Sequence, residues 1–461
     1  MAGPEWSAAF EQSAEATLGT YQTPGMAVAV ARDGELVYAH GFGYRDRERG
    51  LVPGPETMFG IGSITKSFTC VAILQLQEQG RLSVQDAVQR YLPEFSTPDP
   101  AAARAMTLHH FMTHSSGLPP LPSLYPAMAR SIAGDPAAPP QLAGGEFRPI
   151  DTPADLMESI AHGDYELLGP AGAQFSYSND AYALLGTVIE RVSGTSYGAY
   201  LQEHILGPAG MTASTLPADL GSDAATLYAS RPGTEEVFAA PQWWDAPAML
   251  AAGFLKSNAR EMLRYLEIYR TGGLVGRERL LSAASVAAMC QPHVPVSPRA
   301  GYGYGLLITP GYHGVTLVEH SGGLKGISAQ VTVVPERGLT SVALANIAGA
   351  PSGLVLLRAV NAMMGLPLGT RRAEYPTVVP APGDLHPYVG TYRSGEGARI
   401  EVAAEAGGLI FEAEGKRLPA RFVGDEAFVV TQREDETHAR FLRRDGAVWA
   451  LAFGSRIVRR A

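Results

Sequence analysis

The stretch FGIGSITKSFT, residues 59–69, decides how the rest of the chain is interpreted. It places Ser63 and Lys66 three positions apart, so on a helix both side chains lie on one face within reach of each other. A serine hydroxyl needs a base to act as a nucleophile, and a lysine serves only when burial or a nearby cation keeps it neutral. This spacing is common by itself, so other segments must support a catalytic interpretation.

A second segment, QFSYSNDAYALLG at 174–186, adds a phenol and an amide where a helix is predicted to begin. The phenol of Tyr177 can relay a proton to a leaving group, and the amide of Asn179 can orient Lys66 and a substrate carbonyl. The same residues also fit a helix cap formed by Ser178 or Asn179. Both roles can hold together, because a cap fixes the geometry that a catalytic group needs.

A third segment, VTLVEHSGG at 315–323, ends a predicted strand with His320 and the glycines Gly322 and Gly323. Glycines at a strand edge let a substrate backbone lie close and leave an N–H free for an oxyanion. Three such segments in one chain favour nucleophilic acyl transfer. No G-x-S-x-G elbow is present to support a different serine triad.

The hydrophobic pattern predicts strands at both ends of a long helical region. Two apolar runs flank a turn within residues 25–44, which predicts a β-hairpin. Helices are expected over 64–79, most of 153–291 and 351–364, with strands over 303–346. This order predicts an α+β domain with an antiparallel sheet. The proline-rich residues 118–153 are expected to lack continuous helix or strand, as in many functional loops.

Residues 366–385 are rich in proline and glycine without periodicity, which predicts a linker between a domain over 1–365 and a second over 386–461. Six short, evenly spaced strands are expected in the second domain, and they predict a small all-β barrel or sandwich.

The composition narrows the partners. The chain has 461 residues, 46% hydrophobic residues and a net charge of −9, which is typical of a globular protein and argues against nucleic-acid binding. No apolar run is long enough to span a membrane. The first 21 residues lack the basic and apolar regions of a signal peptide, so we expect a cytoplasmic location and no membrane partner. Two cysteines are too few for a disulfide framework.

The three segments, in this order, resemble the active-site motifs of the serine β-lactamase and penicillin-binding-protein superfamily, in its branch of related esterases and peptidases. The resemblance covers about residues 10–365 and extends to MTHSSGLP at 112–119, ILGPAGM at 205–211 and YGYGLLI at 302–308. It implies an antiparallel sheet flanked by helices, with a helical subdomain. The stretch 387–413 resembles the lipocalin-like domain that follows some D-specific peptidases and penicillin-binding-protein-type thioesterases, which implies that the second domain is a lipocalin-like barrel.

Carried over by position, the resemblance implies that Ser63 is acylated and that Lys66 is its base. Tyr177 matches the tyrosine that shares this base work and protonates the leaving group, and Asn179 matches the asparagine of the same motif. The backbone N–H groups of Ser63 and Gly323 would form the oxyanion hole.

His320 stands where dedicated β-lactamases mostly keep a lysine that grips the antibiotic's carboxylate. Histidine is cationic only part of the time near neutral pH, and at this position it resembles esterases, D-amino-acid-specific peptidases and peptide-cyclising thioesterases. We therefore expect a peptide or small-molecule acyl donor, carrier-bound or thioester-activated, that reacts at a D-residue and is released by water or an internal amine. A carboxylesterase is the alternative, ahead of a true β-lactamase or a non-catalytic peptide-binding module.

Three further side chains are expected to contact substrate. Trp243 and Trp244 fit a cleft wall as well as they fit core packing. The resemblance implies that the barrel lies against the catalytic cleft, so a charged residue on its last strands, Arg456 in FGSRIVRR, can face substrate, although a solvated basic tail explains it too. No metal site or cofactor is expected, because His313, Glu319 and His320 lack convergent ligand spacing.

Overall fold

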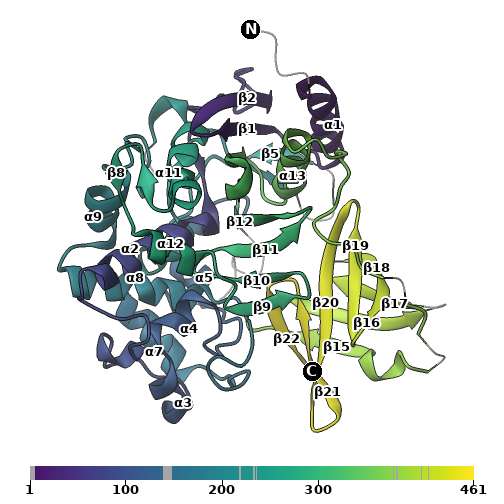
Figure 1. Cartoon of the computed structure of the whole chain (residues 1–461). Helices are drawn as coiled ribbons and strands as arrows, with labels where there is room; N and C mark the ends of the chain where they lie inside the picture. The colour runs from purple at the N-terminus through teal and green to yellow at the C-terminus, as the bar shows by residue number, and fades with distance from the viewer. Residues whose placement is uncertain are drawn as a thin grey trace.

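The computed structural model describes residues 6–138, 148–217, 220–231, 234, 236–376, 378–380, 383–405, 408–413 and 415–461. Within them the chain forms an eight-stranded sheet with helices on both faces, and a closed eight-stranded barrel lies beside it (Figure 1). This arrangement confirms the α+β fold with a C-terminal barrel. Among the described residues, no helix is both long and apolar enough to cross a membrane.

The large sheet is antiparallel throughout, in the order β2-β1-β14-β13-β12-β11-β10-β9. The predicted N-terminal hairpin joins the later strands through β1 and β14, where Val28 pairs with Ala343. The short strands β9 and β10 were not predicted. The strands are β1 (Gly25–Arg32), β2 (Glu35–Gly43), β9 (Val294–Ser297), β10 (Ala300–Tyr302), β11 (Leu307–Tyr312), β12 (Val315–Leu324), β13 (Ile327–Val334) and β14 (Leu339–Ala345).

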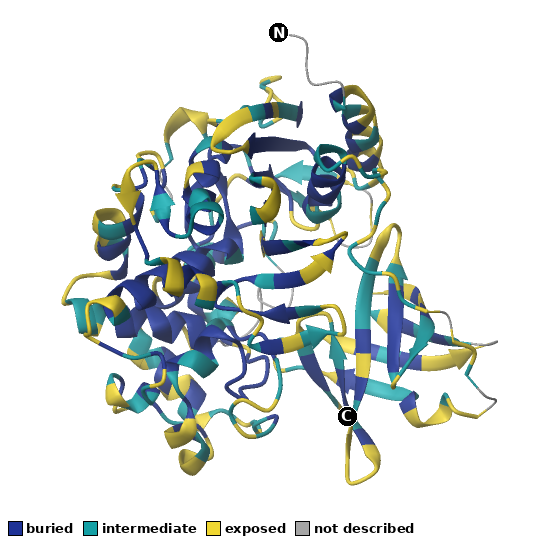
Figure 2. Ribbon diagram, viewed as in Figure 1, coloured by how far each residue is buried: buried dark blue, intermediate teal, exposed yellow. Residues whose placement is uncertain are grey.

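Both faces of this sheet are covered, which explains the continuous apolar runs in its central strands. Along β1, Met26 and Val28 point to the face covered by α1 (Ser7–Thr20) and α13 (Ser352–Met363). Ala27 and Ala29 point to the opposite face and join the largest core, among the remaining helices. Figure 2 shows these helices buried where they meet the sheet.

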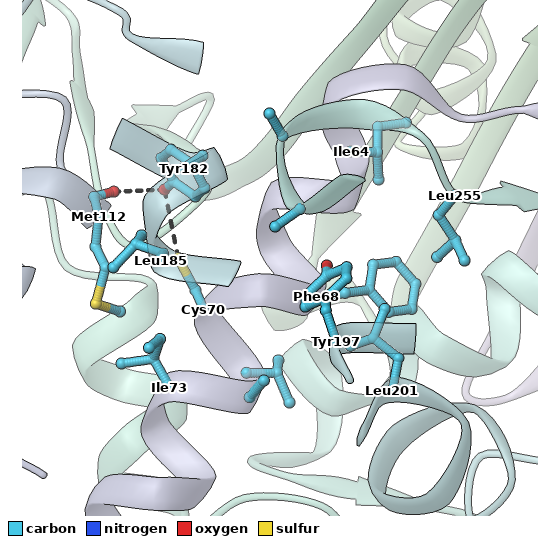
Figure 3. Packing of buried hydrophobic residues seen from close by; sticks show 14 of the residues in the cluster. Ile64, Phe68, Cys70, Ile73, Met112, Tyr182, Leu185, Tyr197, Leu201 and Leu255 are labelled. Carbon is cyan, nitrogen blue, oxygen red and sulfur yellow. Dashed lines mark hydrogen bonds between the residues drawn. The ribbon is translucent and has the colours of Figure 1, made fainter. Parts of the chain in front are cut away.

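The centre of the helical face is the packing of α2 against α8 (Figure 3). Tyr182 of α8 donates a hydrogen bond to the carbonyl of Met112 over 2.6 Å and contacts the buried thiol of Cys70 on α2. The helices on this face are α2 (Thr65–Glu78), α3 (Pro100–Ala105), α4 (Leu108–Met112), α5 (Leu124–Ile132), α7 (Pro153–His162), α8 (Asn179–Ser193), α9 (Tyr197–Leu201), α10 (Leu250–Gly253), α11 (Ala259–Thr271) and α12 (Ala283–Met289).

Short strand pairs accompany these helices: β3 (Phe59–Gly60) with β6 (Lys256–Ser257), β4 (Tyr228–Ser230) with β5 (Val237–Ala239), and β7 (Leu274–Val275) with β8 (Glu278–Arg279). The expectation of no helix within 118–153 was wrong for α5. Pro126 lies in the first turn of α5, where the backbone N–H that proline lacks has no helical partner. Pro139 and Pro140 lie outside the described residues.

The barrel closes where β22 pairs with β15, with Tyr392 opposite Arg460. These two strands were missed, and they are the ones that close the barrel. Its core holds Phe411, Phe428 and Phe441. The strands are β15 (Gly390–Arg393), β16 (Arg399–Glu405), β17 (Gly408–Ala413), β18 (Lys416–Gly424), β19 (Ala427–Gln432), β20 (Asp435–Arg444), β21 (Ala447–Phe453) and β22 (Arg456–Arg460).

The barrel packs against the rest of the molecule through apolar and charged contacts. Leu168 forms a small buried cluster with Ala450 and Ile457 of the last two strands. Arg459 of β22 pairs with Glu166 over 2.5 Å. These contacts bring the β21–β22 hairpin to the segment that leads into α8.

Candidate active site

Ser63 lies in a tight turn, η1 (Gly62–Ile64), immediately before α2. Gly62 adopts φ +52°, and a Cβ there would lie 2.6 Å from the amide nitrogen of Gly323 on β12. Glycine is therefore required both by the backbone angle and by the close approach. The same approach brings the backbone of Ser63 beside the end of β12, as the oxyanion-hole hypothesis needs.

Lys66 is fully buried on α2, and its Nζ has three polar neighbours. The distances are 3.1 Å to Ser63 Oγ, 2.9 Å to Asn179 Oδ1 and 2.5 Å to the carbonyl oxygen of Ala252. Burial, and next the positive charge of Arg456, hold the pKa of Lys66 well below its usual value. Among the described residues no carboxylate forms an ion pair with the amine, so a neutral lysine fits this environment.

Tyr177 and Asn179 flank the helix cap that the sequence suggested. Ser178 Oγ accepts a hydrogen bond from the amide of Ala181 and so begins α8. The ring of Tyr177 lies under the Lys66 amine, 4.7 Å from Nζ to the ring centroid. Burial raises the pKa of Tyr177 above its usual range, although the neighbouring Ser63 hydroxyl opposes the rise. The phenol is therefore a proton donor near neutral pH.

His114, in the segment MTHSSGLP, is a site residue that sequence reasoning did not identify. Its Nδ1 accepts a hydrogen bond from the amide of Ser178 over 3.0 Å, and its carbonyl accepts one from Ser176 over 2.8 Å. Its ring packs on Tyr177 with centroids 3.9 Å apart. Full burial holds the pKa of His114 well below its usual value. A neutral imidazole thus positions the segment that carries Tyr177 and Asn179. The sequence feature that could have identified His114 was its position within MTHSSGLP.

His320 is buried in the wall of the site, and both of its ring nitrogens are engaged. Nδ1 lies 2.6 Å from the carbonyl of Ser321, and Nε2 lies 2.8 Å from the hydroxyl of Tyr302. A neutral ring that donates from Nδ1 and accepts at Nε2 satisfies both contacts. Burial lowers the pKa of His320 to about 3. His320 is therefore uncharged at neutral pH, a more complete loss of the cation than the sequence suggested.

The end of β12 is an open strand edge. β11 pairs with β12 only as far as Glu319, whereas β13 continues along it to Leu324. A Cβ on Gly322 would lie 1.9 Å from the carbonyl oxygen of Ile61, so this position holds β12 against the turn before Ser63. Gly323 is exposed beside that turn.

The two tryptophans lie at one side of this edge and have different environments. Trp244 is buried, and its Nε1 donates to Asp135 over 2.7 Å. Trp243 is half-buried and lies against Gly60, and both tryptophans line one small cavity with Lys325 and Leu324. Trp244 thus packs as a core residue, whereas Trp243 is the more accessible of the two.

Arg456 extends from the barrel to Tyr177. Its guanidinium carbon lies 4.6 Å from the ring centroid of Tyr177, and its Nε donates to Glu396 over 2.9 Å. The amide of Tyr177 donates to the carbonyl of Ser455, the residue before Arg456, over 3.0 Å. The structure thus brings Arg456 to the site rather than leaving it in a solvated tail. Glu396, on the turn between β15 and β16, is a second barrel residue that sequence reasoning missed.

The residues that were considered for a metal site or a disulfide have other environments. Glu319 pairs with Arg372 over 2.9 Å. Cys70 and Cys290 are free thiols. Within the described ranges, no three histidine, cysteine, aspartate or glutamate side chains are grouped as a metal ion would require.

Comparisons with known proteins agree with this geometry. The family described as Beta-lactamase matches residues 10–362. Penicillin-binding protein 4 of Amycolatopsis lactamdurans is 28% identical over 389 residues, which cover 82% of this chain and 95% of that protein.

Two solved structures show how far the similarity extends. The octameric penicillin-binding protein homologue from Pyrococcus abyssi has 28% identity and a TM-score of 0.70, over 98% of this chain and 99% of that one. A D-stereospecific amidohydrolase from Streptomyces sp. has 26% identity and a TM-score of 0.63, over 77% of this chain and 98% of that one. The chain therefore belongs to the beta-lactamase family and shares the serine-hydrolase fold of the penicillin-binding proteins.

Proposed function

We propose that this protein is a serine acyl-transfer enzyme that forms a covalent acyl-enzyme on Ser63. Its substrate is a peptide amide, ester or thioester that reacts at a D-residue, and the acyl group is released to water or to an amine of the same substrate. The proposal covers a D-specific peptidase and a peptide-cyclising thioesterase, because both use the same first step.

The observation that carries the proposal is the set of three contacts at Lys66 Nζ. A neutral amine has two N–H donors and one lone pair. Asn179 Oδ1 and the Ala252 carbonyl only accept hydrogen bonds, so they occupy the two donors. The lone pair is then left for the third neighbour, the hydroxyl of Ser63, 3.1 Å away. Lys66 is thus oriented as a base toward the nucleophile.

Acylation then follows in three proton transfers. The proton of the Ser63 hydroxyl moves to Lys66 as Oγ bonds to the substrate carbonyl carbon, and the oxyanion faces the amides of Ser63 and Gly323. When the tetrahedral adduct collapses, the bond to the leaving group breaks, and Tyr177 gives that group a proton. Lys66 returns its own proton to Tyr177, which restores both residues. Water or an amine repeats these transfers in reverse to release the acyl group.

Three observations support a peptide acyl donor. The similarity to a D-stereospecific amidohydrolase extends over 77% of the chain. Neutral His320 provides no cation for a β-lactam carboxylate, whereas Arg456 provides one from the barrel. A cavity of about 850 Å³ lies between β9 and the barrel and is lined by Phe175 and Arg456, which leaves room for a peptide beside Arg456. We propose Trp243, Gly322 and Arg456 as substrate contacts, and a carrier-bound or thioester donor in the cytoplasm.

A carboxylesterase is the second candidate, because a small ester meets the same nucleophile and oxyanion hole without needing Arg456. The two functions are separated by incubating the protein with a peptidyl thioester ending in a D-residue, its L-residue counterpart, p-nitrophenyl acetate and a chromogenic cephalosporin.

Intact-mass spectrometry follows the acyl adduct, and chromatography follows the products. We expect a Ser63 adduct with the D-thioester, a faster reaction than with its L-counterpart, and no adduct after Ser63→Ala. Equal rates for D- and L-donors together with a preference for the simple ester would select the esterase. No adduct with any donor would exclude an acyl-enzyme.

A further inference from the structure

The barrel places a charged pair directly against the catalytic residues. The Arg456 guanidinium and the Lys66 amine lie over the ring of the same tyrosine, Tyr177, at 4.6 and 4.7 Å from its centroid. The guanidinium carbon and the amine nitrogen are therefore no more than about 9.3 Å apart, in a region with little solvent to screen the charge of Arg456. Glu396 holds the guanidinium in place through contacts of 2.9 and 3.3 Å.

We propose that Arg456 and Glu396 are positioning residues for acyl transfer, whose opposite charges set how readily Lys66 is available as a neutral base beside Tyr177. This inference rests on the proposed acyl-transfer function. It assigns the barrel a role in the chemistry itself, in addition to any contact with substrate.

The geometry supports this role in two ways. The hydrogen bond from the Tyr177 amide to the Ser455 carbonyl fixes β22 to the catalytic segment, so Arg456 cannot shift without disturbing Tyr177. Arg456 and Glu396 are both partly buried, at 24% and 26% side-chain exposure, so water weakens their fields less than it would at an open surface.

The charges act on Lys66 with opposite signs. A cation near Lys66 disfavours its protonated form, so Arg456 lowers the pKa of the lysine, and the anion Glu396 opposes this effect. Arg456 also lowers the pKa of Tyr177, so it favours the base form of either residue. The other titratable groups that face Lys66 are the buried Cys70, His114, Tyr177, Asp180, Tyr182 and His320.

The test is the pH dependence of kcat/KM for p-nitrophenyl acetate, a neutral ester with no carboxylate for Arg456 to bind. Activity on the acid side requires neutral Lys66. Arg456→Gln removes the cation, so we expect the acid limb to move to higher pH by about one unit. Glu396→Gln removes the anion and should move that limb to lower pH. Arg456→Lys retains the charge and should restore most of the wild-type profile.

A matched control is available on the same strand. Arg459→Gln also removes an arginine of β22 that pairs with a glutamate of the catalytic domain, Glu166, but that pair does not contact Tyr177. Its pH profile should match the wild type. Thermal melts show whether each variant folds; if Arg456→Gln does not, Glu396→Gln still tests the predicted shift.

Unchanged acid limbs in the folded variants, or shifts in the same direction for Arg456→Gln and Glu396→Gln, would overturn the inference. A rise in KM for the D-peptidyl thioester with an unmoved profile for the neutral ester would also overturn it and leave Arg456 as a substrate contact. Failure of the proposed function looks different, because the wild-type protein would then form no adduct on Ser63.

Discussion

Lys66 Nζ lies 2.5 Å from the carbonyl oxygen of Ala252, a residue of the short helix α10. The next residue, Gly253, lies against the backbone of Gly62 and Ser63. One turn of helix therefore supports both the proposed base and the segment that carries the proposed nucleophile. A backbone acceptor keeps the amine oriented without adding the negative charge that would favour its protonation.

Lys66→Met is expected to change how stability depends on pH. Because its pKa is lowered in the folded protein, Lys66 loses its proton at a pH where the unfolded lysine still binds one. The unfolded state then binds more protons, so this residue makes wild-type stability rise with pH, by up to about 1.4 kcal/mol per unit. Lys66→Met lacks that rise. Thermal melts from neutral pH to about pH 10 measure the difference between the two proteins; parallel curves would contradict a neutral Lys66.

Tyr177→Phe should separate activity from stability. The buried hydroxyl of Tyr177 makes no hydrogen bond of ordinary geometry within the described residues, so removing it leaves no partner unsatisfied. We expect an unchanged or slightly higher melting temperature, with acylation slower by about 100-fold or more. Stopped-flow acylation of Ser63 and a thermal melt check both parts. A large loss of stability would show that the hydroxyl has a structural partner.

His114→Asn and His114→Ala should differ. His114 adopts φ +55°, a conformation that asparagine tolerates better than alanine. The asparagine oxygen can also accept the hydrogen bond from the Ser178 amide that Nδ1 now accepts. We expect His114→Ala to lower kcat by about 10- to 100-fold through misplacement of Tyr177, with KM little changed. His114→Asn should recover part of that loss, and equal activities would argue against positioning through this bond.

Gly322→Ala and Gly323→Ala form a pair that tests the contact between β12 and the nucleophile's turn. A Cβ on Gly322 would lie 1.9 Å from the Ile61 carbonyl oxygen, whereas one on Gly323 meets nothing nearer than 4.0 Å. Gly322→Ala should therefore destabilise the fold by about 1 to 3 kcal/mol and reduce acylation. Gly323→Ala should fold like the wild type. Urea unfolding distinguishes the two, and equal stabilities would contradict the close approach.

Patterns and local spacing predicted the hairpin, the strand–helix–strand order and the segments that carry Ser63, Tyr177 and His320. The strands and the helix that depend on contacts with distant parts of the chain were not predicted. Strands β9, β10, β15 and β22 are short, and pairing with neighbours rather than local pattern defines them. Helix α5 was missed because proline was judged without regard to its position in the first turn.

The same limit applies within the site. The Ala252 carbonyl has no side-chain signature, and Glu396 lies in a turn of a separate domain, so neither could be assigned from spacing. His114 does lie in a segment that resembles the family, but its role depends on the burial and the bond to Ser178 that only the fold provides.

The bond between the Tyr177 amide and the Ser455 carbonyl has a consequence for the order of events during synthesis. Ser63 and Lys66 leave the ribosome early, whereas Ser455 and Arg456 belong to the last hairpin of the barrel. A growing chain therefore carries its serine long before the final strand holds Tyr177 in place. For the proposed acyl transfer, we therefore expect full reactivity only after synthesis has reached that hairpin.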